Sequence, residues 1–352
     1  MMFDYKKRLK KLRSELIKKS VDSFLVTNET NVAYLSGFTG NDSLLLVTPY
    51  SQFFLTDSRF TEEAHDTVKG FTIAEVASST YETISNVIRK NRLKRMGFES
   101  MNLPFGAVKR LEGYIGRCKI LPVNNIVERL RAVKEDEEIN IIKRSIGITK
   151  DVLKKAVRAI RPGVSERVLS QIIECEFMKR GARASFETIV ACGKNSSKPH
   201  AHPTDTKIKK NDVIMIDIGC KLNSYNSDIT RMILMGKIKD RIKKIYNIVK
   251  AAQDKALETI RPGRKISEID SAGRSYIDKK GFGKFFGHSL GHGVGMDVHE
   301  EPSISRRNSE VLKPGMVFTI EPAIYIPKFV GVRIEDMVLV TENGFGLLTI
   351  RQ

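Results

Sequence analysis

Two stretches one hundred residues apart carry the same short text: "KAVRAIRPGVSERV" at 155–168 and "KALETIRPGRKISEI" at 255–269. Each has Lys-Ala, then Ile-Arg-Pro-Gly, then Ser-Glu. Pro-Gly is typical of a helix end, because Pro cannot continue a helix and Gly readily adopts the left-handed conformation that closes one. Gly181 and Gly281, farther on, keep the same spacing. The pattern predicts, in each copy, a helix closed by Pro-Gly, a second helix and a glycine stop.

A strand-like segment follows each copy: "KKNDVIMIDIG" at 209–219 and "LKPGMVFTIEPA" at 312–323. Each holds one acid in an apolar run, Asp217 in the first and Glu321 in the second. A repeat that keeps helix, glycine, turn and strand in order indicates a duplicated α+β half. The alternative, that helix-ending chemistry simply recurs, remains open from these residues alone.

Length and composition are those of a two-domain globular chain, with 352 residues of which 41% are hydrophobic. Short apolar runs at 23–28, 43–49 and 52–60 mix with helical segments, which predicts a small α/β domain over 1–124. Longer helical periodicity predicts a second domain over 125–352. The first twenty residues are too charged for a secretory signal, and no run reaches the roughly 18 apolar residues of a membrane span. We therefore expect a cytoplasmic protein without a membrane segment.

The formal net charge of +19 raises the question of nucleic acid as a partner. The excess is spread along the chain, and its densest run, "KKRLKKLRSELIKK" at 6–19, has the spacing of an amphipathic helix with a solvated basic face. This distribution argues against nucleic-acid binding as the main function. Cys118, Cys175, Cys192 and Cys220 have no metal-type spacing and are expected to be buried small apolar residues.

Four carboxylates are the candidate chemistry. A hairpin that turns at Leu222 and Asn223 would set Asp217 directly opposite Asp228, with Cβ atoms about 5 Å apart. Glu321 and Glu335 flank a longer loop with its midpoint at Lys328, which predicts a second facing pair. Four converging carboxylates cannot all stay ionised without cations, because like charges raise one another's pKa values. Two divalent ions would cancel the charge.

Histidines accompany these acids. "FFGHSLGHGVGMDVHEEP" at 285–302 and residues 200–202 together hold five of the six histidines of the chain. The glycines of the first stretch allow close backbone approach. One imidazole with four carboxylates is an oxygen-rich donor set that suits Mn, Co, Fe or Zn. His202, beside Pro203, is expected to be only a polar loop residue.

The words "PHAHPT", "VIMIDIGCKLNSYNSDITR", "HSLGHGVGMDVHEEP", "TIEPAIYIP" and "GVRIED" resemble the active-site text of the M24 metallopeptidases, the family of creatinase, prolidase and methionine aminopeptidase. "NVAYLSGFTG" and "LTDSRF" resemble the amino-terminal domain of prolidases and aminopeptidase P. The resemblance covers essentially the whole chain. It implies a creatinase-like α/β domain followed by a catalytic "pita-bread" domain of two pseudo-symmetric α+β halves.

The resemblance also implies a role for each matching residue. Asp217 would hold one metal ion, Asp228 and Glu335 would bridge both ions, and His292 and Glu321 would hold the other. Glu321 would also shuttle a proton. His200 and His299 would contact substrate and stabilise the tetrahedral oxyanion. Arg333 is a further candidate for substrate contact; alternatively it only pins the hairpin beside Glu335.

The implied activity is hydrolysis of the Xaa-Pro bond at the amino terminus of peptides, with two divalent ions per subunit, Mn or Co before Zn or Fe. Many prolidases have Arg just after His-Glu-x-Pro, where it can pair with a dipeptide carboxylate, whereas this chain has Ser303. The departure favours an Xaa-Pro aminopeptidase over a prolidase that acts on dipeptides, although Arg306 and Arg307 lie close by in sequence. The resemblance also implies a homodimer. A non-catalytic nucleic-acid-binding module on the same scaffold is the competing hypothesis.

Overall fold

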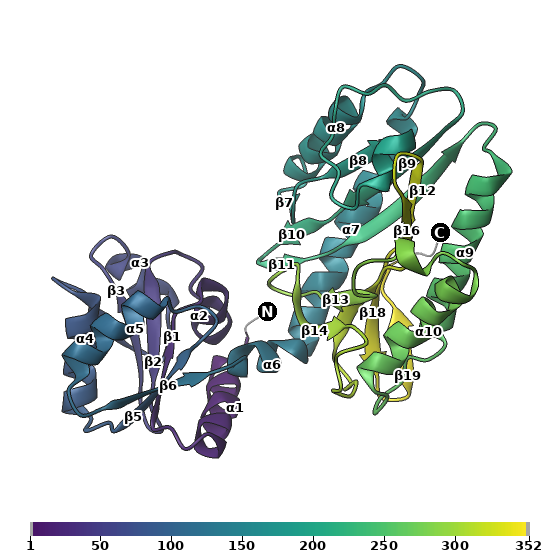
Figure 1. Ribbon diagram of the computed structural model, residues 1–352. Coiled ribbons are helices and arrows are strands. Elements are labelled where there is room, and N and C mark those ends of the chain that lie inside the picture. The colour runs from purple at the N-terminus through teal and green to yellow at the C-terminus, as the bar shows by residue number, and fades with distance from the viewer. Residues whose placement is uncertain (1–2, 350–352) are drawn as a thin grey trace. The chain divides into compact units, whose positions relative to one another are not determined.

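The computed structural model describes residues 3–349 and divides into two compact units that meet in the chain at Arg131 and Ala132 (Figure 1). The helix α6 (Ile126–Ala132) carries this division. The predicted boundary after residue 124 lies just before the same helix. In the part of the chain that the structure describes, no helix is long and apolar enough to cross a bilayer.

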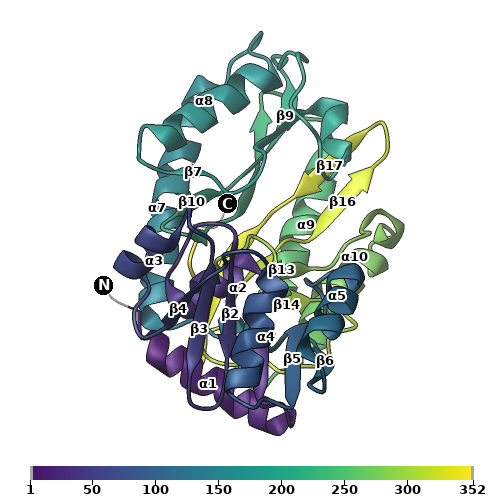
Figure 2. The same ribbon diagram turned by 90° about the vertical axis from the view of Figure 1, so that its left-hand side faces the viewer.

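The amino-terminal unit is an α/β domain, as predicted, built on a six-stranded sheet of order β4-β3-β2-β1-β5-β6. The strands are β1 (Ser23–Val26), β2 (Ser43–Val47), β3 (Gln52–Thr56), β4 (Thr72–Glu75), β5 (Arg95–Glu99) and β6 (Lys119–Val123). The helices are α1 (Tyr5–Lys18), α2 (Glu29–Ser36), α3 (Thr61–Thr67), α4 (Thr80–Lys90) and α5 (Phe105–Ile115). In Figure 2, α4 and α5 lie in front of the strands, and their buried apolar residues pack against one face of the sheet.

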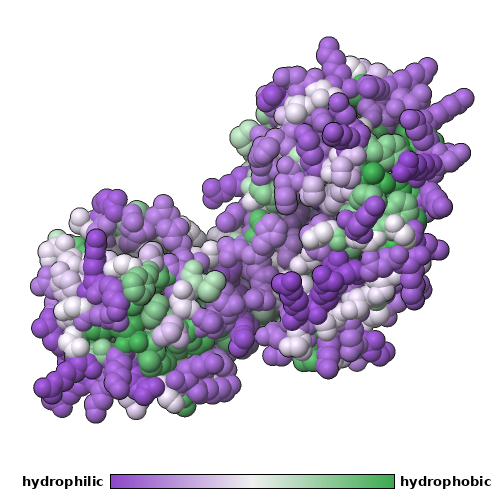
Figure 3. Space-filling model, in the orientation of Figure 1, coloured by the Kyte–Doolittle hydropathy of each residue, from purple (hydrophilic) through white to green (hydrophobic). Residues whose placement is uncertain are grey.

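The basic run at the start of the chain forms α1, as its periodicity predicts. Leu9, Leu12 and Leu16 are buried, while most of its lysines are exposed. Hydrophilic residues dominate the face of the protein drawn in Figure 3. The positive charge of α1 is therefore the solvated side of an amphipathic helix, and this helix alone gives no reason to expect a nucleic-acid site.

The second unit contains the repeat, which the structure confirms as a duplicated architecture. The first copy is α7 (Asp136–Ala159) and α8 (Glu166–Met178), and the second is α9 (Asp240–Leu257) and α10 (Ile266–Lys279). Gly163 and Gly263, with φ of 94° and 79°, end the two Pro-Gly turns. The backbone N–H of Gly163 donates to the carbonyl oxygen of Ile208, and that of Gly263 to the carbonyl oxygen of Leu312, each at 2.9 Å. Both acceptors lie a few residues before the strand that carries or precedes the acid of that half. Recurrent helix-ending chemistry would not produce these matched long-range bonds.

Each half adds strands to its helix pair. The first half has β7 (Arg183–Ala184), β8 (Ile189–Cys192), β9 (Asp212–Ile218), β10 (Cys220–Leu222), β11 (Tyr225–Asn226) and β12 (Ile229–Met235). The second half has β13 (Gly291–Gly293), β14 (Glu300–Ile304), β15 (Val317–Ile320), β16 (Ala323–Ile326), β17 (Val330–Arg333), β18 (Asp336–Thr341) and β19 (Gly344–Leu347). β9 is central in the order β12-β9-β8, and β15 and β18 are neighbours in the order β14-β13-β15-β18-β19. The site lies where these strands end.

The hairpin register predicted for the first half is wrong by one turn residue. The turn is centred on Asn223 and Ser224, which have φ of 46° and 68°. Two-residue hairpin turns of this kind need positive φ at both central positions, which Leu222 adopts less readily than the small polar residues do. Asp217 therefore faces Thr230 and not Asp228.

The register predicted for the second half is confirmed. Ile320 pairs with Asp336 and Ala323 with Arg333, so Glu321 and Glu335 stand at opposite positions between these two pairs. Lys328, at the predicted midpoint, has φ of 60°. Among the cysteines, three are buried as expected, but the expectation is wrong for Cys175, which is exposed on α8.

Candidate metal centre

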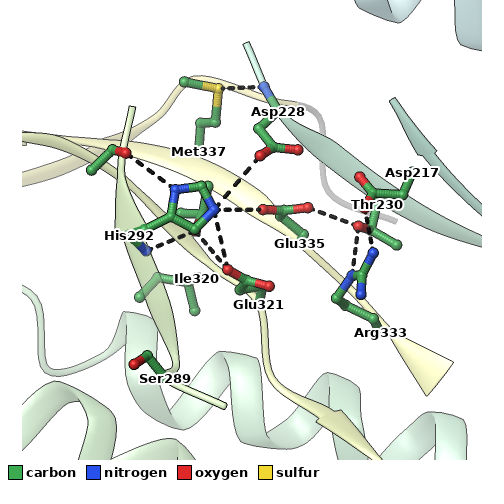
Figure 4. Close-up of polar contacts among 12 residues, drawn as sticks. Asp217, Asp228, Thr230, Ser289, His292, Ile320, Glu321, Arg333, Glu335 and Met337 are labelled. Carbon is green, nitrogen blue, oxygen red and sulfur yellow. Dashed lines mark hydrogen bonds and ion pairs between the residues drawn. The ribbon is translucent and has the colours of Figure 1, made fainter. Parts of the chain in front are cut away.

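His292 lies at the centre of a group of carboxylates drawn from both halves of the second unit (Figure 4). Its Nε2 lies 3.3 Å from Oε1 of Glu321, 3.6 Å from Oδ2 of Asp228 and 4.0 Å from Oε1 of Glu335. Asp228, His292 and Glu335 each offer one ligand atom, and these three atoms all lie within 4.8 Å of one another. The structure thus brings together four of the five sequence-predicted ligands around one imidazole nitrogen.

The strand β13 presents His292 in a single orientation. Its Nδ1 lies 3.1 Å from the carbonyl oxygen of Gly293, and its backbone N–H donates to Thr319 Oγ1 at 3.1 Å. A Cβ on Gly291 would meet the carbonyl oxygen of Thr319 at 1.9 Å, and one on Gly293 would meet that of Glu301 at 2.2 Å. Only Gly fits on either side of the histidine, so close packing requires the Gly-His-Gly motif. In this arrangement Nε2 of His292 points toward the acids.

Asp217, the fifth predicted ligand, joins the group through Arg333. The guanidinium of Arg333 donates to Oδ2 of Asp217, to Thr230 Oγ1 at 2.9 Å and to Tyr325 Oη at 2.6 Å. Thr230 in turn donates to Oε2 of Glu335 at 2.7 Å. Arg333 and Thr230 therefore link the carboxylate of Asp217 in the first half to the carboxylate of Glu335 in the second half.

Sequence reasoning missed Thr230 and Tyr325. Thr230 is the cross-strand partner of Asp217, so the correct hairpin register would have found it. Tyr325 faces Gly331 across the β16–β17 ribbon, and no spacing rule links its hydroxyl to Arg333.

The acids are buried together, and this changes their protonation. Burial, and next the neighbouring Glu335, raises the pKa of both Asp228 and Glu321. Burial and then Asp217 raise the pKa of Glu335 to about 7. Burial and then His299 lower the pKa of His292 to about 4, so this imidazole is neutral near pH 7. A neutral imidazole is the ligand form of His, whereas the acids need positive charge nearby to ionise together.

Two carboxylate oxygens show directly why this centre needs a cation. Oδ1 of Asp217 and Oδ1 of Asp228 are buried and have no hydrogen-bond partner among residues 3–349. A buried oxygen with no donor is costly, and a divalent ion would satisfy it. The donor set therefore fits divalent metal ions: it is rich in oxygen, contains one imidazole and lacks thiolate.

Two cavities open on this centre. The smaller, of 220 Å³, contains Phe186, Glu187, Ile189 and the acids of both halves. The larger, of 520 Å³, is lined on its far side by His288, Ser289, Ser303 and Tyr325. Five residues line both cavities: His200, His292, His299, Glu321 and Arg333. The metal centre thus lies between two spaces of different size.

The remaining predicted histidines lie at the entrance. His200 and His299 are exposed, and the ring of His299 is centred 4.2 Å from that of His292. His202 is 79% exposed and pairs with Glu187 at 2.9 Å, as expected for a polar loop residue. His288, to which sequence reasoning assigned no role, is partly buried in the wall of the larger cavity, and burial lowers its pKa to about 4.

Comparison with protein-family models adds the deciding observation. The model of metallopeptidase family M24 matches residues 140–342, and the creatinase/prolidase amino-terminal domain matches residues 8–133. The chain belongs to metallopeptidase family M24. It is a hydrolase with a creatinase-type α/β domain followed by a pita-bread catalytic domain.

Several M24 relatives are similar over nearly their whole length. A protein named Xaa-Pro dipeptidase from Pyrococcus horikoshii is 36% identical, over 97% of this chain and 96% of the relative. The structure of an Xaa-Pro dipeptidase from Bacillus anthracis has a TM-score of 0.95 and 36% identity, covering 99% and 98% of the two chains. An X-Pro aminopeptidase structure from Thermotoga maritima has a TM-score of 0.87 and 34% identity, covering 97% and 98%.

Proposed function

We propose that this chain is a two-metal exopeptidase that cleaves the Xaa-Pro bond at the amino terminus of peptides. The observation that carries the proposal is the imidazole of His292 within 4.0 Å of carboxylates from both halves, in a chain of the M24 family. The names of the dipeptidase and aminopeptidase relatives support the Xaa-Pro bond as the target. We also expect a homodimer, which light scattering would test.

We assign Asp217 to one ion, Asp228 and Glu335 to both ions, and His292 and Glu321 to the other. The unpartnered Oδ1 atoms of Asp217 and Asp228 support this assignment. Mn or Co suits a set of four carboxylates and one imidazole, with Zn or Fe as alternatives. When bound, such ions polarise the scissile carbonyl and lower the pKa of water toward neutrality.

The side chains of the protein would supply the other requirements. Glu321 is partly buried beside His292 and accepts a hydrogen bond from Thr319 Oγ1 at 3.3 Å, which orients it to carry a proton to the leaving nitrogen. His200 and His299 line both cavities, where they can donate to the carbonyl oxygen as negative charge develops on it. Arg333 is occupied by Asp217, Thr230 and Tyr325, so we assign it to holding Asp217 in place instead of to binding substrate.

An Xaa-Pro bond calls for this kind of site. Proline has no amide N–H and a fixed φ, so it cannot register in a peptidase that reads an extended, hydrogen-bonded strand. An exopeptidase that holds the free amine does not depend on that register. Asp217, with its free Oδ1, is the anchor we assign to the amine side of the substrate.

Substrate length is the finer part of the proposal, and we favour peptides longer than two residues. A dipeptide places its carboxylate next to proline and would need a cation in the larger cavity. Of the described residues that line this cavity, Arg333 is the only Lys or Arg, and it is bound to Asp217. Ser303 lines it, while Arg306 and Arg307 are exposed on the following loop. The names of two relatives favour the alternative, a prolidase acting on dipeptides.

Three peptides test the proposal: Ala-Pro, Ala-Pro-Ala and Met-Ala-Ser, each with metal-stripped protein and with added Mn or Co. We expect metal-dependent release of Ala from Ala-Pro-Ala, slower hydrolysis of Ala-Pro and none of Met-Ala-Ser. Preference for Ala-Pro would establish the prolidase alternative. Absence of hydrolysis of any peptide by metal-loaded protein would overturn the proposal.

The net charge of +19 favours one other candidate, a nucleic-acid-binding module. It predicts salt-sensitive binding of RNA that persists in Asp228→Ala. A binding module has no use for four clustered carboxylates, whose mutual repulsion it would have to tolerate. Metal-dependent peptide release lost in Asp228→Ala would rule in favour of the peptidase.

A further inference from the structure

The two cavities beside the metal centre differ in charge, and this gives the substrate a direction. The smaller cavity contains the carboxylates of Glu187, Asp217, Asp228, Glu321 and Glu335. Among the described residues that line the larger cavity, Glu321 is the only carboxylate. A peptide carries its positive charge at the free amine, so the first residue belongs in the smaller cavity and the proline side in the larger. This step rests on the proposed function.

In the described part of the chain, Glu187 is the one carboxylate of the smaller cavity that we do not assign to a metal ion. It lies in the segment between β7 and β8, and its side chain is 63% exposed. His202 Nδ1 contacts its Oε2 at 2.9 Å. Within the described residues, its Oε1 has no hydrogen-bond partner. One oxygen is thus available to a cation that enters the cavity.

Two residues close to Glu187 in the sequence, the preceding one and the one two positions after it, form an apolar part of the cavity wall. Phe186 and Ile189 line the same cavity, and Ile189 is only 8% exposed. An apolar wall that ends at a solvated carboxylate matches the side chains of Lys and Arg, which lay a hydrocarbon stem on apolar surface and keep the charge in water. A neutral side chain would use the wall alone, and an acidic one would meet Glu187.

We propose that Glu187 determines the specificity for the first residue, selecting peptides that begin with Lys or Arg before proline. His202, which holds one oxygen of Glu187, also lines this space, together with His200, His299, Arg333 and the four carboxylates of the metal centre. Because Glu187 is largely exposed, its effect is that of a solvated ion pair. We expect a three- to fivefold preference, which corresponds to about 0.7 to 1 kcal/mol at 1.4 kcal/mol per tenfold.

The test compares Lys-Pro-Ala with norleucine-Pro-Ala, since norleucine keeps the stem of Lys without its charge. We expect kcat/KM for the Lys peptide to be about three to five times higher in the metal-loaded protein and the ratio to shrink in 0.5 M salt. Glu187→Gln should bring the ratio to about one. Glu187→Lys should turn the preference toward Glu-Pro-Ala. Glu258→Gln, an exposed acid paired with Lys255 at the end of α9, is the matched control and should leave the ratio unchanged.

A ratio near one in the unaltered protein, or the same ratio in Glu187→Gln, would overturn the role of Glu187 while leaving the peptidase intact. If neither peptide is hydrolysed, the proposed function fails instead. Calorimetric Kd values for the two intact peptides then give the same ratio without turnover, so the role of Glu187 is decided in either case.

Discussion

The two halves of the catalytic unit share a scaffold but hold their acids in different ways. In the first half, Asp217 faces Thr230 and Asp228 lies two residues before that threonine. In the second half, Glu321 and Glu335 stand opposite each other, between the β15–β18 and β16–β17 pairs. The repeated pair of helices joined by a Pro-Gly turn is therefore followed by an offset pair of acids in one half and by a facing pair in the other. The register of each hairpin, more than the internal symmetry, determines how the four carboxylates are arranged.

The symmetry does extend to the loops around the cavities. Glu166 in α8 and Asp270 in α10 are both fully buried. Glu166 accepts the backbone N–H of Cys192 at 2.7 Å and of Thr204 at 3.0 Å, on either side of His200. Asp270 accepts the N–H of Leu290 at 3.1 Å and pairs with Arg274, which donates to the carbonyl of His288 at 2.7 Å. Each half thus fixes one histidine-bearing loop by one buried acid.

The largest effect should come from neutralising one acid of each pair. We expect Asp228→Asn and Glu335→Gln each to lower kcat/KM by about 1000-fold or more, because loss of an ion's Lewis-acid action removes several kcal/mol of transition-state stabilisation. Elemental analysis should find less than the full metal content. The neutral control is Asp205→Asn, an exposed acid that forms an ion pair with Arg167. Full activity in either variant would break the assignment of both halves to one centre.

The second effect concerns stability without metal. The raised pKa of Glu335, about 7, means that the native protein keeps this proton at pH values where the unfolded chain has lost it. The contribution of Glu335 to the free energy of unfolding is then full below about pH 4.5 and is lost as the pH rises through about 7. The lowered pKa values of His288 and His292 have the opposite effect: their contribution to the free energy of unfolding increases as the pH rises from about 4 to 6.5.

The variant Glu335→Gln separates the contribution of Glu335 from those of the two histidines. Between pH 5 and 8, metal-free Glu335→Gln should become progressively more stable than the metal-free unaltered protein, by up to about 3 kcal/mol at 1.36 kcal/mol per pKa unit. Urea unfolding at each pH measures the difference. Saturating Mn should remove it, because the ion replaces the proton. A difference that stays constant with pH would show that Glu335 is already ionised in the metal-free protein.

Local chemistry explains what the sequence predicted of the fold. Pro-Gly turns, helical periodicity and apolar runs act within a few residues, so both helix pairs and the first three strands of the α/β domain were predictable. The facing pair of Glu321 and Glu335 was also predictable, because its ribbon is symmetric about Lys328. The offset pair was not, since moving the turn by one residue moves every cross-strand partner by two.

Long-range contacts explain the rest of the site. Arg333 meets Asp217 across 116 residues of sequence, and Thr230 meets Glu335 across 105. No spacing rule encodes such distances, and the roles of Thr230 and Tyr325 follow only once the strands are paired. The same holds for Glu187, whose neighbour His202 was expected to be only a polar loop residue.

The third effect should be on substrate binding. Glu166→Gln and Asp270→Asn each weaken charge-assisted hydrogen bonds to a loop, worth about 1.5 to 3 kcal/mol in total stability. We expect KM for Ala-Pro-Ala to rise about 3- to 10-fold in each variant, with metal content unchanged, because the loops carry cavity walls, whereas the ligands lie on strands or directly beside strand ends. Glu166→Asp, which keeps the charge, should recover part of the KM. Loss of metal in either variant would mean that the loops and the metal centre are one unit.

The smallest effect tests the turn that sets the offset pair. Ser224 has φ of 68°, a conformation that costs a side chain free energy and that Gly adopts without cost. Gly also gains entropy in the unfolded chain, so the two contributions partly cancel. We expect Ser224→Gly to raise the free energy of unfolding by about 0.5 kcal/mol, and Ser224→Val to lower it, since a branched side chain is a poor fit for positive φ. Equal stability of the two variants would show that tertiary packing, and not the turn, fixes the register that separates Asp217 from Asp228.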